Sequence, residues 1–267
     1  MASSLSSTAA SVYRRPGLLV PSVSLCRREI VRFLRQPGRV IGALASPLMF
    51  WLFIGSGVGT SFQPPGAPTD LPFLAFLHPG ILTMVVLFTA IFSTISIIED
   101  RQAGFLQGVL VAPVGRSAIV FGKLLGGAVL ATLQATLLLP LLWLAGVWPP
   151  LLHLLCAMAV MFLLGLGLTG LGFVLAWRMD STQGFHAVMM TFLLPLWMLS
   201  GAFFAPSGAM GWVQVAMMLN PMTWGVDLLR ALLSPGVAPA LPWMASLGLL
   251  SAFTVGMMLV CLRTAQR

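Results

Sequence analysis

Long apolar stretches make up most of this chain, and short polar segments separate them. Six stretches are each long enough to cross a bilayer, because about 20 apolar helical residues cover the roughly 30 Å of hydrocarbon. They are about 40 to 61, 74 to 98, 119 to 145, 151 to 177, 184 to 204 and 241 to 262. The pattern predicts an all-α integral membrane protein with six transmembrane helices.

The composition agrees with a membrane protein. Of the 267 residues, 58% are hydrophobic and 7% are charged, whereas soluble domains carry about 25% charged residues. The net charge of +8 is spread between apolar stretches, so it does not indicate a nucleic-acid-binding surface. The three cysteines share no metal-binding spacing, which argues against a metal site. We expect a flexible arm at 1 to 21 and one membrane domain at 22 to 267.

The positive residues predict the orientation of the helices. Short loops rich in Lys and Arg stay in the cytoplasm. Thirteen of the 14 basic residues belong to the N-terminal arm, to the margins of the loops after the second and fourth stretches, or to the tail, and only Arg230 falls on the other side. Both termini are therefore expected in the cytoplasm.

Residues 22 to 38 differ from the six stretches because apolar and basic positions alternate with a helical period. Arg28, Arg32 and Arg35 fall on one face, and Pro37 ends the pattern before the first stretch. We expect an amphipathic helix along the inner interface, with these arginines toward anionic lipid headgroups. A solvated basic stretch that only sets the topology is the alternative.

Residues 205 to 240 are too long for a turn between two helices. They contain two short apolar helical patterns that meet at Asn220 and Pro221. Asn is a favoured N-cap and Pro a favoured first helical residue. We expect two short re-entrant helices that dip into the outer leaflet, with Asp227 and Arg230 as an i,i+3 pair on the second.

Two stretches match nucleotide-binding motifs by letter only. "GLGLTG" at 165 to 170 fits GxGxxG but lies inside an apolar stretch, so close helix packing by Gly165, Thr169 and Gly172 is the better interpretation. "GKL" at 122 to 124 lacks the flanking residues of a phosphate-binding loop. The sequence predicts no nucleotide site, catalytic site, metal or cofactor in this chain.

Charge is concentrated in "IIEDRQAGFLQGVLVAPVGRS", residues 97 to 117. Charge at the bilayer centre is costly, so Glu99, Asp100 and Arg101 mark where the second stretch leaves the membrane. The apolar segment after them is too short to cross the membrane again.

A short amphipathic helix in that segment would expose Phe105, Leu106 and Leu110, and Pro113 would end it. Exposed apolar side chains flanked by charge need a cover. The lipid surface is one candidate, but a soluble partner subunit fits the charge better.

The run at 97 to 127, "IIEDRQAGFLQGVLVAPVGRSAIVFGKLLGG", resembles the signature of the ABC transporter type-2 permeases: an acidic pair, a Gly-Phe-Leu turn, Val-Ala-Pro-Val, Arg, and Gly-Lys-Leu. Residues 199 to 233 are similar to that family's Ser-Gly-x-Phe-Phe and Asn-Pro-Met-Thr-x-Gly-Val-Asp stretch. The motifs follow the family's order and cover essentially the whole chain, and multidrug, antibiotic-resistance and nodulation exporters are the most similar type. Gln107 departs from the Glu of many members, so this chain has no acidic side chain for an ion pair at that position.

The resemblance implies the membrane half of an exporter in the bacterial inner (plasma) membrane. Two copies would pair as a homodimer among the membrane lipids, with a pair formed with a sister permease as the alternative. Each copy would dock a separate ATP-binding subunit that holds ATP and Mg²⁺. The segment at 101 to 112 would be the coupling helix, which drives helix pairs between inward-open and outward-open states. The coupling residues would be Glu99, Asp100, Arg101, Gly104, Phe105, Leu106, Leu110, Pro113, Arg116 and Lys123, and the outer gate or dimer roof would contain Asn220, Pro221, Asp227 and Arg230.

Proteins of other classes are the alternatives. A secondary transporter would carry ionisable groups inside its spans and often an internal repeat, and the sequence has neither. A non-transporting anchor or assembly subunit of an ATPase complex also fits, but it would show no substrate-stimulated ATP hydrolysis. A hydrophobic or amphiphilic cargo (drug, lipid or lipid-linked glycan) is expected because few polar side chains line the spans, chiefly Thr83, Ser93, Thr94, Ser96 and Gln134.

Overall fold

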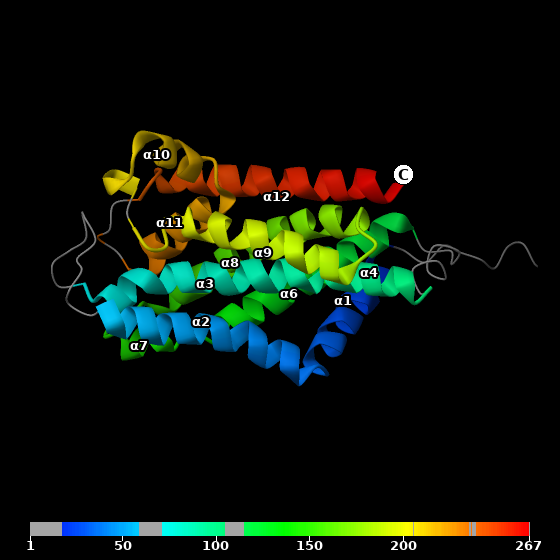
Figure 1. The fold of residues 1–267 in the computed structure, drawn as a ribbon, viewed down its shortest axis with the longest axis horizontal. Helices are drawn as coiled ribbons and strands as arrows, with labels where there is room; N and C mark the ends of the chain where they lie inside the picture. The colour runs from blue at the N-terminus through cyan, green and yellow to red at the C-terminus, as the bar shows by residue number, and fades with distance from the viewer. Residues whose placement is uncertain are drawn as a thin grey trace, which may run out of the picture.

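The computed structural model describes residues 18–58, 71–104, 115–204, 206–234, 236 and 239–266. All regular structure in these residues is helical, and the long helices run side by side along one axis (Figure 1). The helices are α1 (Leu19–Leu34), α2 (Pro37–Val58), α3 (Phe73–Ser93), α4 (Ile95–Gln102), α6 (Arg116–Thr136), α7 (Leu141–Leu144), α8 (Leu151–Trp177), α9 (Thr182–Met198), the 3₁₀ helix η2 (Pro206–Gly208), α10 (Gly211–Met218), α11 (Pro221–Leu233) and α12 (Trp243–Gln266). The all-α prediction is confirmed.

Five segments of the described residues are long and apolar enough to cross a membrane. They are Val40–Gly57, Phe73–Gln102, Arg116–Leu144, Leu151–Trp177 and Trp243–Gln266. Helix α9 covers most of the fifth predicted span, but it has 17 residues and ends at Met198 rather than near residue 204. The sixth crossing and the orientation therefore stay predictions.

Helix α3 lies at the centre of the bundle. Nearly all of its residues from Phe73 to Ile91 are buried, and it packs against α2, α6, α8 and α11. Small residues let the neighbouring helices approach closely. A methyl group on Gly165 of α8 would lie 3.4 Å from the Cα of Ala128, and one on Gly172 would lie 3.2 Å from the Cα of Ile91. The prediction of close helix packing at these glycines is confirmed.

A proline inside α3 is compensated by the end of helix α11. Pro79 has no N–H to donate to the carbonyl of Ala75, four residues earlier. The hydroxyl of Ser234 donates to that carbonyl instead, at 2.8 Å. The end of α11 is therefore anchored on the break in the hydrogen bonding of α3.

The junction of α10 and α11 has the predicted capping. The side chain of Asn220 accepts a hydrogen bond from the backbone N–H of Met222 at 2.9 Å, and Pro221 is the first helical residue of α11. The Asn220 amide also donates to the carbonyl of Leu196 at 2.6 Å, so the same residue holds α11 against α9.

Candidate functional site

Helices α1, α4 and α6 meet around one buried ammonium group. Lys123 of α6 has a side chain that is 5% exposed. Its Nζ donates to a carboxylate oxygen of Glu29 and to one of Asp100, both at 2.7 Å, and to the hydroxyl of Ser96 at 2.9 Å. An ammonium group has three N–H donors, so the charge of Lys123 is fully satisfied inside the protein.

Two arginines of α1 reach the same carboxylates from the other side. Arg28 binds Asp100 with both terminal nitrogens, at 2.7 and 3.1 Å. Arg32 donates to Asp100 at 2.9 Å and to Glu99 at 2.6 Å. The hydrogen bond to Asp100 raises the pKa of the Arg28 guanidinium. We call Arg28, Glu29, Arg32, Ser96, Glu99, Asp100 and Lys123 the charge cluster.

The guanidinium groups of Arg28 and Arg32 both bind carboxylates of α4, so they are not directed to lipid headgroups alone, as the sequence pattern suggested. Their contact with lipid stays a prediction. Arg35, the C-cap residue of α1, is exposed. Sequence reasoning also missed Glu29, which is buried on the inner face of α1 together with Ser22. The sequence did contain a sign of this buried acid. Glu29 is the single acidic residue among the arginines of this segment, and it lies seven residues after Ser22, on the same helix face.

The end of α4 is tied to the turn between α8 and α9 as well. Arg101 donates to the carboxylate of Asp180 at 2.9 Å and to the carbonyl of Trp177 at 2.6 Å. Gln102 donates to the carbonyl of Asp180 at 2.7 Å. Gly104 then adopts a left-handed backbone with φ of 71°, which favours glycine and ends the helix.

Five of the residues predicted to couple to an ATPase are at this end of the bundle: Glu99, Asp100, Arg101, Gly104 and Lys123. Arg116 begins α6 and donates to the carbonyl of Gln266 at 2.8 Å, at the end of α12. Phe105, Leu106, Leu110 and Pro113, together with Gln107, lie outside the described residues.

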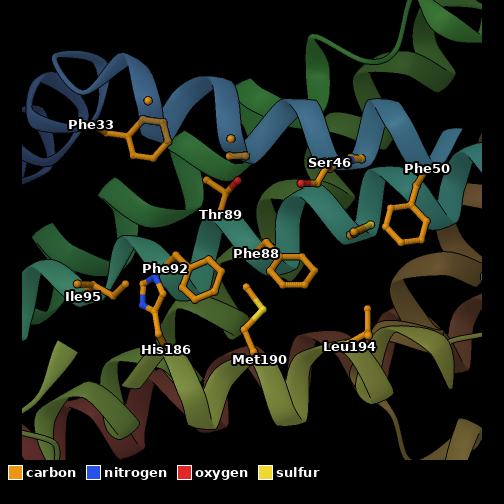
Figure 2. Close-up of a pocket in the computed structure, with 15 residues that line it drawn as sticks. Phe33, Ser46, Phe50, Phe88, Thr89, Phe92, Ile95, His186, Met190 and Leu194 are labelled. Atoms are coloured by element: carbon orange, nitrogen blue, oxygen red, sulfur yellow. The ribbon is translucent and has the colours of Figure 1, made fainter. Parts of the chain in front are cut away.

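An apolar pocket of about 460 Å³ lies between α2, α3 and α9 (Figure 2). Its described lining contains no Asp, Glu, Lys or Arg. The rings of Phe92 and His186 stack there at 4.9 Å between centroids. Residues that line the pocket include Phe33, Gly38, Gly42, Ala43, Ser46, Pro47, Phe50, Met84, Phe88, Thr89, Phe92, Ile95, His186, Met190 and Leu194.

The polar groups of this pocket are not those expected from the sequence. Thr83, Ser93, Thr94 and Ser96 donate to carbonyls of the preceding helical turn. Thr89 lines the pocket and donates to the Gln134 side chain behind it. Ser46 and His186 supply the other polar side chains of the lining.

At the other end of the bundle, Asp227 and Arg230 of α11 have separate partners. The carboxylate of Asp227 accepts from the backbone N–H groups of Ala240 and Leu241, each at 3.2 Å. Arg230 is 2% exposed, and its guanidinium carbon lies 4.2 Å from the ring centroid of Phe76. The guanidinium group also donates a hydrogen bond to the backbone carbonyl of Gly201. Burial lowers the pKa of Arg230 to about 10.

The predicted i,i+3 pair on α11 forms no salt bridge, since no ion pair joins these two described side chains, although their opposite charges still attract each other. Asp227 instead holds the start of α12, and Arg230 holds the segment after α9 against α3. The two charged residues connect three helices at this end of the bundle.

Residues 22–234 match the family described as ABC-2 type transporter. A putative transport permease, ycf38, from Cyanophora paradoxa is 31% identical over 216 residues, which cover 79% of this chain and 73% of that protein. The daunorubicin resistance ABC transporter permease protein DrrB1 from Streptomyces coeruleorubidus is 24% identical over 208 residues, 77% of this chain and 72% of that protein. The probable multidrug ABC transporter permease YbhR from Escherichia coli K12 is 25% identical over 166 residues, 60% of this chain and 44% of that protein. The charge cluster and the pocket both lie within the matched region.

Proposed function

This chain belongs to the ABC-2 type transporter family, and we propose on that basis that it is the permease subunit of an ATP-driven exporter. The cargo is a hydrophobic or amphiphilic molecule that leaves the cytoplasm across the bacterial inner membrane. A separate ATP-binding subunit hydrolyses ATP, and two copies of this chain pair. Relatives named as multidrug and daunorubicin resistance permeases support this class of cargo.

The apolar pocket between α2, α3 and α9 is the observation that carries the cargo assignment. Aromatic rings of Phe50, Phe88 and Phe92 and the flexible thioethers of Met84 and Met190 surround it. Such side chains bind apolar molecules of varied shape. A lipid-linked glycan would need many hydrogen-bonding partners for its sugars, so the pocket favours a drug or a lipid.

The charge cluster supports a mechanical link between this pocket and an ATPase. Helix α4 leads directly into segment 105–114, and it follows α3 after only Thr94. Helix α3 supplies a wall of the pocket. A force on segment 105–114 would therefore pass through α4 to the pocket wall, while the cluster keeps α1 and α6 attached. We propose that this link drives alternation between inward-open and outward-open states.

The test is ATP hydrolysis by the neighbouring ATP-binding subunit in lipid nanodiscs, with and without this chain. The variant Phe105→Asp plus Leu106→Asp is expected to insert normally but to lose association with the ATPase. The matched control is Leu151→Asp plus Leu152→Asp, two exposed residues at the start of α8 and at the opposite end of the bundle. Acidic residues are favourable in a first helical turn, so this control should keep association.

Normal association of the Phe105 and Leu106 variant would contradict the coupling assignment. Hydrolysis that depends on the chain but is never stimulated by apolar compounds would favour the non-transporting anchor instead.

A further inference from the structure

A hollow of about 460 Å³ on α1 is lined by Arg28, Val31, Arg32, Arg35 and Gln36. The three arginines follow at spacings of four and three residues, so they stand in one row along the helix. Figure 1 shows α1 at the edge of the bundle. The side chains of Arg28 and Arg32 are still 33% and 28% exposed despite their bonds to the charge cluster.

Arg32 has hydrogen-bond donors left for a ligand. A guanidinium group has five N–H donors, and Arg32 uses one bond from each terminal nitrogen, to Asp100 and Glu99. Arg35 is exposed, and the salt bridges of the cluster do not include it. Phosphate oxygens suit such planar donors, which bind them in pairs.

The charge cluster and the neighbouring Arg35 carry more positive than negative charge. Together they comprise four cations, Arg28, Arg32, Arg35 and Lys123, and three carboxylates, Glu29, Glu99 and Asp100. The net charge of these groups is +1. A phosphodiester group carries one negative charge and would balance it.

An exposed apolar row runs beside the arginine row. Val20, Val23, Val31 and Leu34 are 70%, 61%, 38% and 60% exposed, and they recur at the spacing of one helix face. Val31 and Leu34 directly precede Arg32 and Arg35 in the sequence. An inorganic anion would use the arginines alone, whereas a phospholipid would use both rows.

We propose that this surface of α1 is a binding site for an anionic phospholipid. The phosphate lies in the hollow against Arg32 and Arg35, and the acyl chains lie along the apolar row. Because Arg32 also holds Glu99 and Asp100, the bound lipid braces the charge cluster from outside. The proposal is independent of the ATPase and of transport.

The test uses the purified full chain in mild detergent with equimolar phosphatidylglycerol and phosphatidylcholine of identical acyl chains. Native mass spectrometry counts the bound lipids. The wild-type chain is expected to be enriched in phosphatidylglycerol. Arg35→Gln should lower this enrichment about fivefold, the effect of one basic residue near an anionic lipid, and Arg35→Lys should largely keep it. Arg178→Gln, at an exposed arginine that follows α8, is the matched control and should change nothing.

Thermal unfolding identifies any variant that fails to fold. Arg35→Glu serves as the second test, and it should lose more of the phosphatidylglycerol enrichment than Arg35→Gln. Equal binding of the two lipids by the wild-type chain would overturn the proposal. So would undiminished enrichment in Arg35→Gln, or full displacement of the lipid by millimolar inorganic phosphate.

Discussion

The ammonium Nζ of Lys123 lies 2.7 Å from a carboxylate oxygen of Asp100, and both side chains are almost fully buried. The contact joins α6 to α4. The two residues are 23 positions apart in the sequence, and the whole segment 105–114 lies between them. Two charges held this closely in a desolvated place are costly to separate. The entrance and exit of that segment are therefore fixed relative to each other.

Replacing Lys123 should destabilise the protein strongly. Lys123→Met leaves Glu29 and Asp100 without their shared ammonium, and loss of one partner of a buried pair costs about 3–5 kcal/mol. Adding Glu29→Gln removes the carboxylate that has lost its closest cationic partner, so part of this cost should be recovered. Unfolding by denaturing detergent in micelles measures both, with Arg263→Met on the exposed face of α12 as the control. A cost below about 1 kcal/mol for Lys123→Met, the range of an exposed pair, would contradict the cluster.

The Ser234 hydroxyl should matter only because of Pro79. Ser234→Ala leaves the Ala75 carbonyl buried without a donor, which costs about 1–3 kcal/mol. In a Pro79→Ala background the new N–H at position 79 satisfies that carbonyl, and Ser234→Ala should then cost little. A double-mutant cycle of unfolding free energies checks this. An equal cost in both backgrounds would show that the hydroxyl acts in some other way.

The pocket should respond to a larger side chain at Gly42. A methyl group there meets nothing within 4 Å, and Gly42 lines the pocket, so Gly42→Leu should fill part of the cavity. We expect an apolar fluorescent dye to bind about tenfold more weakly, or roughly 1.4 kcal/mol. Gly248→Leu on α12 is the matched control, because Gly248 also has open space around it. Equal dye affinities in the two variants would remove the pocket from the cargo route.

The helices and the local caps could be predicted from the sequence because they depend on neighbouring residues. Apolar length marked the spanning helices, and Asn220 with Pro221 marked the start of α11. The end of α9 was placed too late because apolar residues continue beyond it. The structure ends that helix at Met198, soon after Pro195, and turns at Gly201 with φ of 82°.

The charge cluster and the pocket could not be predicted in the same way, because each joins distant parts of the chain. Arg28 and Asp100 are 72 residues apart, and a helical pattern alone places Arg28 on a polar face without naming its partner. Thr89 lines the pocket only because α2 and α9 both lie beside α3. Single-helix patterns carry no information about such packing.

The most direct test of the account is ATP-driven export by proteoliposomes that contain this chain and its ATP-binding subunit. Wild type is compared with Asp100→Asn plus Lys123→Met, which removes one acid and one base and so keeps the charge balance. Arg178→Gln is the control, and binding of the ATPase is measured in the same vesicles. If the charge cluster links the ATPase to the pocket, the double variant should still bind the ATPase but should export an apolar dye about tenfold more slowly. A tenfold slower export corresponds to the loss of roughly 1.4 kcal/mol of coupling free energy. Export at the wild-type rate, with normal ATPase binding, would contradict the account.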